Sequence, residues 1–162
     1  MLSIEIVEAD LSRQEHQRAV VDLTDAYAQD PMANGKPLPD AVRQSLVEGL
    51  RRHPTTTILL ATHEGEAIGL ATCFLGFSTF AARPLLNIHD LAVVPEWRGK
   101  GVGRLLLNAV ERKARELGCC KLTLEVLENN RVARRLYEAV GFGQAEYGEG
   151  TGGALFFAKK LL

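Results

Sequence analysis

The chain has 162 residues, of which 46% are hydrophobic and 24% charged, and its net charge is −1 at pH 7. This length and composition indicate one globular domain over residues 1–162, and the near-neutral charge argues against a nucleic-acid binder, which is basic over a broad face. No apolar run reaches the ~18 residues of a membrane span. The three cysteines follow neither a zinc spacing nor a disulfide framework, and the first residues lack a secretory pattern, so we expect a cytoplasmic protein without a metal.

Hydrophobic periodicity and breaker residues predict seven strands and four helices. In chain order we predict a strand at 4–7, a helix through 20–27, a helix at 40–52, strands at 55–61, 67–77 and 85–94, a helix at 102–117, a strand at 121–127, a helix at 130–140, and strands at 142–147 and 154–161. This order is typical of an α+β domain in which a mixed sheet carries helices on its faces.

The most informative segment is a basic, glycine-rich loop between the strand at 85–94 and the next helix. It consists of Arg98, Gly99, Lys100, Gly101, Val102, Gly103 and Arg104. Glycines let the backbone approach a ligand closely, and the following helix directs its unpaired N–H groups and positive dipole end toward the loop. The pattern therefore predicts a phosphate site, with a plain glycine turn as the alternative that the loop alone leaves open.

Spacing excludes two common nucleotide loops. A Walker A loop needs Ser or Thr directly after Gly-Lys, but Lys100 is followed by Gly101. A dinucleotide fingerprint needs G-x-G-x-x-G, whereas Leu106 stands three residues after Gly103.

A second motif lies one helix and one strand further along, in residues 128–142. The first motif, R/Q-x-x-G-x-G/A, is matched by Arg98, Gly101 and Gly103. The second, N-x-x-A-x-x-L-Y-x-x-x-G-F, is matched by Asn130, Ala133, Leu136, Tyr137, Gly141 and Phe142. Together the two motifs resemble those of the GCN5-related N-acetyltransferase (GNAT) superfamily, most strongly over residues 88–142.

The resemblance implies a three-layer fold with a mostly antiparallel sheet of six to seven strands, in which a splayed strand pair admits the pantetheine arm of acetyl-CoA. Backbone groups of Leu91, Ala92 and Val93 are then expected to pair with the pantetheine like an added strand. The N–H groups along residues 98–104 are expected to hold the pyrophosphate. Asn130 is expected to contact the pantetheine, and Ala133 to be small enough to admit the cofactor.

The resemblance also implies the catalytic residues. Tyr137 stands where the family commonly has a general acid that protonates the departing thiolate, although it also fits a buried helix face. Candidate general bases are His89 and Asp90, whose side chains should point to opposite faces of a strand, and Glu125 on the next strand. A water chain without a dedicated base remains open, and nothing in the sequence activates a cysteine as nucleophile.

We therefore expect an acetyl-CoA-dependent N-acetyltransferase, in which a primary amine attacks the thioester directly. The amine can belong to a small molecule, a protein N-terminus or a lysine, bound among residues 30–39, 74–84 and 147–153. The alternative is a non-catalytic acyl-CoA-binding or regulatory module on the same fold. A homodimer is also implied, because many relatives dimerise.

Overall fold

The computed structural model describes residues 3–162, so residues 1 and 2 of the predicted single domain lie outside it. Five strands form one sheet in the order β1-β2-β3-β4-β5. Their bounds are β1 Glu5–Glu8, β2 Thr56–His63, β3 Glu66–Ser78, β4 Arg83–Val93 and β5 Leu122–Leu124. The first four strands pair antiparallel and β5 joins β4 in parallel, which confirms the predicted α+β class with a mixed sheet.

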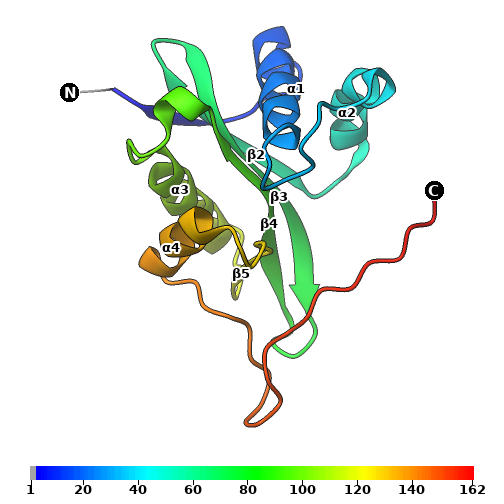
Figure 1. The fold of residues 1–162 in the computed structure, drawn as a ribbon, viewed down its shortest axis with the longest axis vertical. Coiled ribbons are helices and arrows are strands. Elements are labelled where there is room, and N and C mark those ends of the chain that lie inside the picture. The colour runs from blue at the N-terminus through cyan, green and yellow to red at the C-terminus, as the bar shows by residue number, and fades with distance from the viewer. Residues whose placement is uncertain (1–2) are drawn as a thin grey trace.

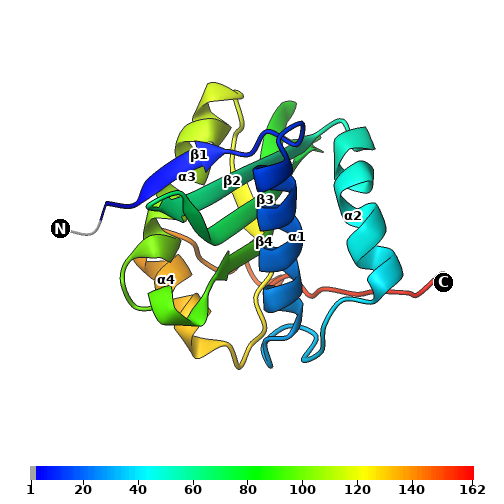
Figure 2. The same cartoon turned by 90° about the horizontal axis from the view of Figure 1, so that it is seen from above.

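Four α-helices and a short 3-10 turn complete the ordered elements of the described residues. The helices are α1 Gln14–Ala28, α2 Asp40–Arg52, α3 Val102–Glu116 and α4 Arg131–Ala139, and the turn is Pro95–Trp97. Helices α1 and α2 lie on one side of the sheet and α3 and α4 on the other (Figures 1 and 2). The fold is therefore the three-layer arrangement that the sequence predicts.

Two apolar clusters hold these layers together, one on each face of the sheet. Toward α1, Val20 and Leu23 pack against Leu60 and Leu70. Toward α3, the helix buries a larger set: Val102, Leu106, Leu107, Ala109, Val110 and Ala114. Gly69 of β3 permits this close contact, because an added Cβ would lie 3.2 Å from the Leu106 side chain and 3.0 Å from the carbonyl oxygen of Ala92.

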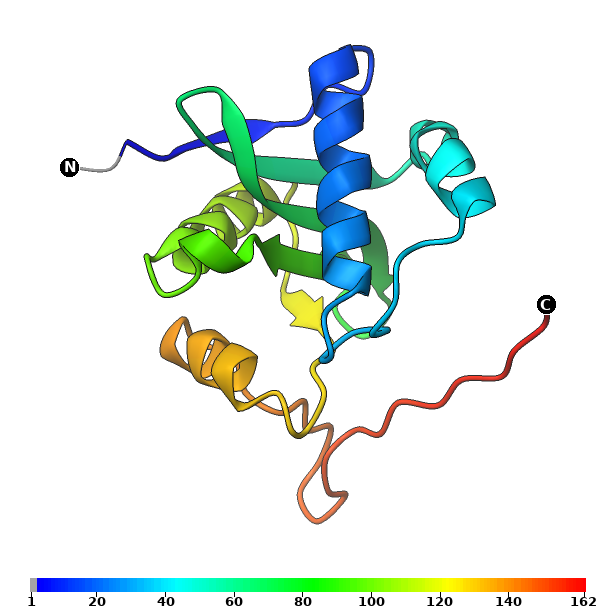
Figure 3. The same ribbon diagram turned by 45° about the horizontal axis from the view of Figure 1, so that its top comes forward.

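The predicted strands at 142–147 and 154–161 are wrong for this chain. Beyond α4 the described residues contain one isolated antiparallel bridge, Glu146↔Gly153, and residues 154–162 then run away from the sheet (Figures 1 and 3). Period-2 alternation gives a strand only where a partner pairs with it along its length, and here pairing is confined to that one bridge. The sheet consequently has five strands instead of six to seven.

No helix within residues 3–162 is both long enough and apolar enough to traverse a lipid bilayer.

Candidate active site

Strands β4 and β5 diverge after a short stretch of pairing. They pair only from Leu86↔Leu122 to Ile88↔Leu124, whereas β4 continues to Val93. Over the described residues no strand lies beside the second half of β4 on this edge. The splayed pair that the sequence resemblance implies is therefore present.

A bulge in β4 switches the sheet edge toward which its backbone N–H and C=O groups point. The Leu86 N–H donates to the Lys121 carbonyl on the β5 side (3.1 Å), but the Val94 N–H donates to the Ile68 carbonyl on the β3 side (3.0 Å). Because N–H and C=O groups alternate between the two edges of a strand, Val93 and Leu91 direct theirs into the open gap. Of the three predicted pantetheine partners, Ala92 instead directs its backbone toward β3, where it is paired with Leu70.

The same bulge decides where His89 and Asp90 lie. The register between β3 and β4 shifts at Thr72/Cys73, which leaves His89 as the extra residue. Ile88 and Leu91 both pack against the α3-side cluster although they are three residues apart. The two residues between them therefore both face α1, and the prediction that they point to opposite faces is wrong.

Contacts on that face agree with this placement. The His89 ring lies edge-on to Phe74, with 5.4 Å between ring centroids, and Phe74 in turn lies 4.8 Å from the ring of His53 at the end of α2. Asp90 is half-buried opposite the buried Thr72. Burial raises the pKa of Asp90, and the neighbouring His89 partly offsets this rise.

Tyr27, on the last turn of α1, joins these groups. Burial raises the pKa of its phenol, and the charges of Asp90 and Asp30 raise it further. The pKa of Tyr137 on α4 rises to about 12, through burial first and then through Tyr27. Tyr27 is thus close enough to both the candidate base Asp90 and the candidate acid Tyr137 for their charges to interact. Sequence reasoning missed it, because a tyrosine on the apolar face of a helix carries no signal of its own.

Tyr137 itself is held by packing. Its ring lies 5.9 Å from that of Phe142, and both pack against the α3-side core. Helix α4 is capped by Asn130, whose side-chain oxygen accepts a hydrogen bond from the Ala133 N–H at 3.2 Å. The cap occupies the Asn130 oxygen and leaves its amide N–H groups for the predicted pantetheine contact, which stays a prediction.

The glycine loop forms an uncapped helix N-terminus. Gly99 and Gly101 have φ of +74° and +86°, in the left-handed region that favours glycine. Within the described chain no side chain caps α3, and its first backbone bond runs from the Leu105 N–H to the Gly101 carbonyl. The N–H groups of Val102, Gly103 and Arg104 are thus available to an anion.

Gly103 also has a packing role that the motif does not reveal. A Cβ at this position would lie 2.9 Å from a methyl carbon of Leu136, so the glycine lets α4 lie directly against α3. The two motifs are therefore in physical contact through Gly103 and Leu136.

Three cations surround the loop. Arg98 donates from Nε to the Val93 carbonyl (3.0 Å) and from Nη2 to Asp30 Oδ2 (2.9 Å), and so joins the loop after α1 to the end of β4. Lys100 Nζ lies 4.9 Å from the centre of the Trp97 ring, and Arg104 is exposed. A cavity of about 180 Å³ adjoins Arg98 and is lined by Tyr27, Val93 and Pro95 among others.

The remaining candidates differ in what they offer. Glu125 lies exposed just after β5, apart from the groups that face α1. Cys73 is buried, which raises its thiol pKa to about 12, with a further contribution from Asp90. Such a thiol is not activated as a nucleophile. Among the described residues no group of three or more His, Cys, Asp or Glu side chains is arranged to hold a metal ion.

Comparison with known proteins agrees with this geometry. Residues 20–142 match the Acetyltransferase (GNAT) family. The uncharacterized N-acetyltransferase YhfO of Bacillus subtilis is 39% identical over 87 residues, which cover 54% of this chain and 58% of that protein. Thialysine N-epsilon-acetyltransferase of Bos taurus is 34% identical over 83 residues, covering 51% and 48%. The chain thus spans about half the length of the curated relatives it matches.

Solved structures share the fold over nearly the whole chain. A probable acetyltransferase has 26% identity and a TM-score of 0.77, with 96% of this chain and 99% of that one covered. An aminoglycoside N-acetyltransferase in complex with CoA has 20% identity and a TM-score of 0.74, with 99% and 97% covered. The chain belongs to the GNAT acetyltransferase family.

Proposed function

We propose that this chain is an N-acetyltransferase that moves the acetyl group of acetyl-CoA to a primary amine. The observation that carries the proposal is the gap between β4 and β5, because the Leu91 and Val93 backbone faces it and the uncapped N-terminus of α3 lies at its end. A pantetheine adds to such an edge as a strand does, and a pyrophosphate suits such a helix end. The CoA bound to the aminoglycoside N-acetyltransferase of the same fold supports this choice of donor.

In this proposal the residues around Tyr27 handle the protons. Asp90, with His89 beside it, accepts a proton from the incoming ammonium, directly or through water, and its raised pKa makes it a stronger base than an exposed carboxylate. The amine nitrogen then forms a C–N bond to the thioester carbon, and the C–S bond breaks. Tyr137 donates its phenolic proton to the departing sulfur, and the second proton that the nitrogen loses as the amide forms returns to the Tyr137 oxygen, directly or through water. The high pKa of Tyr137 keeps its phenolic proton in place at neutral pH until negative charge develops beside it.

The acceptor is expected on the α1 face, beside the rings of His53, Phe74 and His89. A phenylalanine ring flanked edge-on by two imidazoles suits the carbon skeleton of the amine, with Asp90 at its reactive end. The thialysine N-epsilon-acetyltransferase relative makes a lysine-like side chain a natural first acceptor to test. A cytoplasmic location and independence from membranes and nucleic acid belong to the same proposal.

The decisive experiment incubates the chain with acetyl-CoA and a panel of small amines, amino acids, peptides with free N-termini and lysine peptides. Release of free thiol is followed together with the mass of the acetylated product. Transfer to any amine above the uncatalysed rate supports the proposal. Tight binding of acetyl-CoA without transfer would favour the non-catalytic acyl-CoA-binding module, and absence of acetyl-CoA binding would refute both.

A further inference from the structure

Several polar groups on the α1 side of the sheet have no hydrogen-bond partner among the described residues. They are the Tyr27 hydroxyl, the Asp90 carboxylate, the His89 imidazole and Nε2 of His53. The other ring nitrogen of His53, Nδ1, lies 3.3 Å from the Thr55 hydroxyl. Polar groups of folded proteins are normally paired with protein or with ordered water, so a set left open together is available to a ligand.

Phe74 connects the two histidines of this set. The His89 ring lies 5.4 Å from the Phe74 ring, and the Phe74 ring lies 4.8 Å from that of His53. Placed end to end, these separations put the two imidazoles at most about 10 Å apart. Because Asp90 follows His89 directly, this surface has a carboxylate at one end, an imidazole at the other and an apolar ring between them.

The charges of this surface differ from one end to the other. Arginines already hold four acidic side chains of α1, α2 and their connecting loop: Asp22 and Asp25 are held by Arg43, Asp30 by Arg98 and Glu48 by Arg52. This leaves the Asp90 carboxylate for a ligand cation. At the other end His53 follows the last turn of α2, where Arg51 is exposed and makes no ion pair within the described chain. The surface therefore suits a ligand with one cation at the Asp90 end and an anion at the His53 end.

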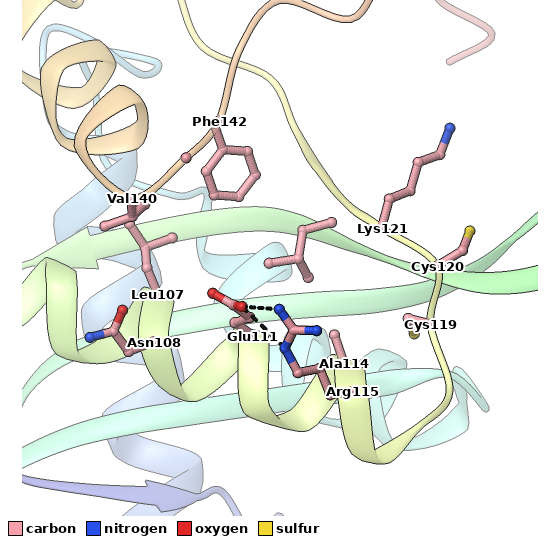
Figure 4. A pocket seen from close by; sticks show the side chains of 12 residues that line it. Leu107, Asn108, Glu111, Ala114, Arg115, Cys119, Cys120, Lys121, Val140 and Phe142 are labelled. Carbon is pink, nitrogen blue, oxygen red and sulfur yellow. Dashed lines mark hydrogen bonds and ion pairs between the residues drawn. The ribbon is translucent and has the colours of Figure 1, made fainter.

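The groove of about 260 Å³ on the α3 side of the sheet offers a different surface. Of the described residues that line it, the acidic one is Glu111, which accepts a hydrogen bond from Arg115 Nε at 3.1 Å. Figure 4 shows these two side chains held together on α3. That carboxylate is already paired, so the α1 side is the better place for an ammonium.

We propose that the acceptor of this chain is an amine whose far end carries a carboxylate, separated from the nitrogen by an extended apolar chain, and that His53 selects it. This inference rests on the proposed function, because it names the acceptor of that reaction. The ammonium lies against Asp90 and the Tyr27 hydroxyl. The apolar chain lies along Phe74, and the carboxylate accepts an N–H hydrogen bond from His53. An imidazole carries such an N–H whether it is neutral or protonated.

The spacing of these groups sets the length of the acceptor. Six bonds of ~1.5 Å in zigzag extension cover about 7–8 Å, and a hydrogen bond at each end adds about 3 Å. An amine and a carboxylate six bonds apart therefore suit the separation of Asp90 and His53, whereas an α-amino group lies too close to its own carboxylate. A diamine would place a second ammonium beside Arg51 and the His53 N–H, where like charge disfavours it.

Three acceptors of equal chain length test this selection. They are 6-aminohexanoate, hexylamine and 1,6-diaminohexane, which end in a carboxylate, a methyl group and a second ammonium. With acetyl-CoA as donor, kcat/KM for 6-aminohexanoate should exceed that for hexylamine by about tenfold or more, and 1,6-diaminohexane should be the poorest. An equal or higher kcat/KM for hexylamine or 1,6-diaminohexane would overturn the inference and leave the proposed N-acetyltransferase function standing.

Calorimetry of the chain with CoA bound measures recognition without turnover. Tighter binding of 6-aminohexanoate than of hexylamine, with no transfer to either, would support the carboxylate recognition and refute the proposed function. Absence of both binding and transfer of 6-aminohexanoate would overturn the inference.

Variants of His53 test its part in the selection. His53→Phe keeps a ring beside Phe74 but has no N–H, so it should reduce the preference for 6-aminohexanoate over hexylamine about tenfold. His53→Gln keeps an N–H donor and should retain part of that preference. His63→Phe, at the opposite end of β2 from His53, is the matched control and should retain all of it. An unchanged preference in His53→Phe, or an equal loss in His63→Phe, would refute the assignment of His53.

Discussion

Replacing Gly101 by alanine tests the donor site without disturbing the core. Gly101 precedes the first turn of α3 with φ of +86°, and an added Cβ would meet no protein atom within 4 Å. The position is therefore open in the free protein and lies where a pyrophosphate would approach the N–H groups of α3. A methyl group there obstructs a ligand and leaves the packing of the chain intact.

The Gly101→Ala substitution should change two measurable quantities, the free energy of unfolding and the affinity for CoA. A left-handed conformation costs a residue with a Cβ about 1–2 kcal/mol, so the free energy of unfolding should fall by about that amount. Hydrogen bonds to a charged group contribute about 1.5–3 kcal/mol each. Losing one such bond to the pyrophosphate would weaken CoA binding about tenfold or more, since 1.4 kcal/mol is a factor of ten.

Gly118 supplies a matched control. It has φ of +72°, its Cβ position is equally open, and it follows the opposite end of α3, a helix about 22 Å long at 1.5 Å per residue. Both alanine variants should lose similar stability in urea unfolding, but only Gly101→Ala should lose CoA affinity in titration calorimetry. Equal CoA affinity in the two variants would refute the pyrophosphate assignment.

The remaining predictions concern three residues around the gap between β4 and β5, namely Tyr137, Asp90 and Asp30. Tyr137→Phe should lower kcat by ~10²-fold or more while CoA affinity is unchanged, and full turnover would remove Tyr137 as the acid. For Asp90, whose pKa is raised by burial, activity should decline as pH falls through that pKa. The folded Asp90 carboxyl binds its proton more tightly than the unfolded one, so Asp90→Asn should raise the free energy of unfolding at neutral pH. This gain should vanish below pH 3.8, the pKa of the unfolded carboxyl. A loss of stability at pH 7 would contradict the raised pKa of Asp90. Asp30→Asn removes the charge partner of Arg98 from a pair whose arginine is half-exposed but whose Asp30 side chain is only 18% exposed, so stability should fall by about 1 kcal/mol. CoA should bind as tightly as before or more tightly, and weaker CoA binding would show that Arg98 must be held by Asp30.

Sequence reasoning succeeded where a local pattern has a local cause. Alternation, helical periodicity and glycine positions locate all five strands and all four helices of the described chain, although α1 begins at Gln14, six residues before the predicted range. Gly99 and Gly101 do adopt the left-handed conformations that the loop requires. The splayed strands are implied by the family resemblance that the two motifs carry, and β4 and β5 do diverge.

It failed where the outcome depends on a neighbouring strand. The extra residue at His89 depends on its register with Thr72 and Cys73 of β3, so strict alternation placed His89 and Asp90 on opposite faces. Residues 142–147 and 154–161 have strand-like sequences, but a strand also needs a partner edge, which the chain does not bring beside them. Tyr27 enters the site only through the packing of α1, more than a hundred residues before Tyr137.

The most direct test of the account is a crystal structure of the chain with acetyl-CoA. The account predicts that the pantetheine pairs with the Leu91 and Val93 backbone and that the pyrophosphate contacts the N–H groups at the start of α3. The thioester sulfur should then lie near the Tyr137 hydroxyl, with Asp90 on the acceptor side. Acetyl-CoA bound outside the gap between β4 and β5, or a sulfur remote from Tyr137, would contradict it.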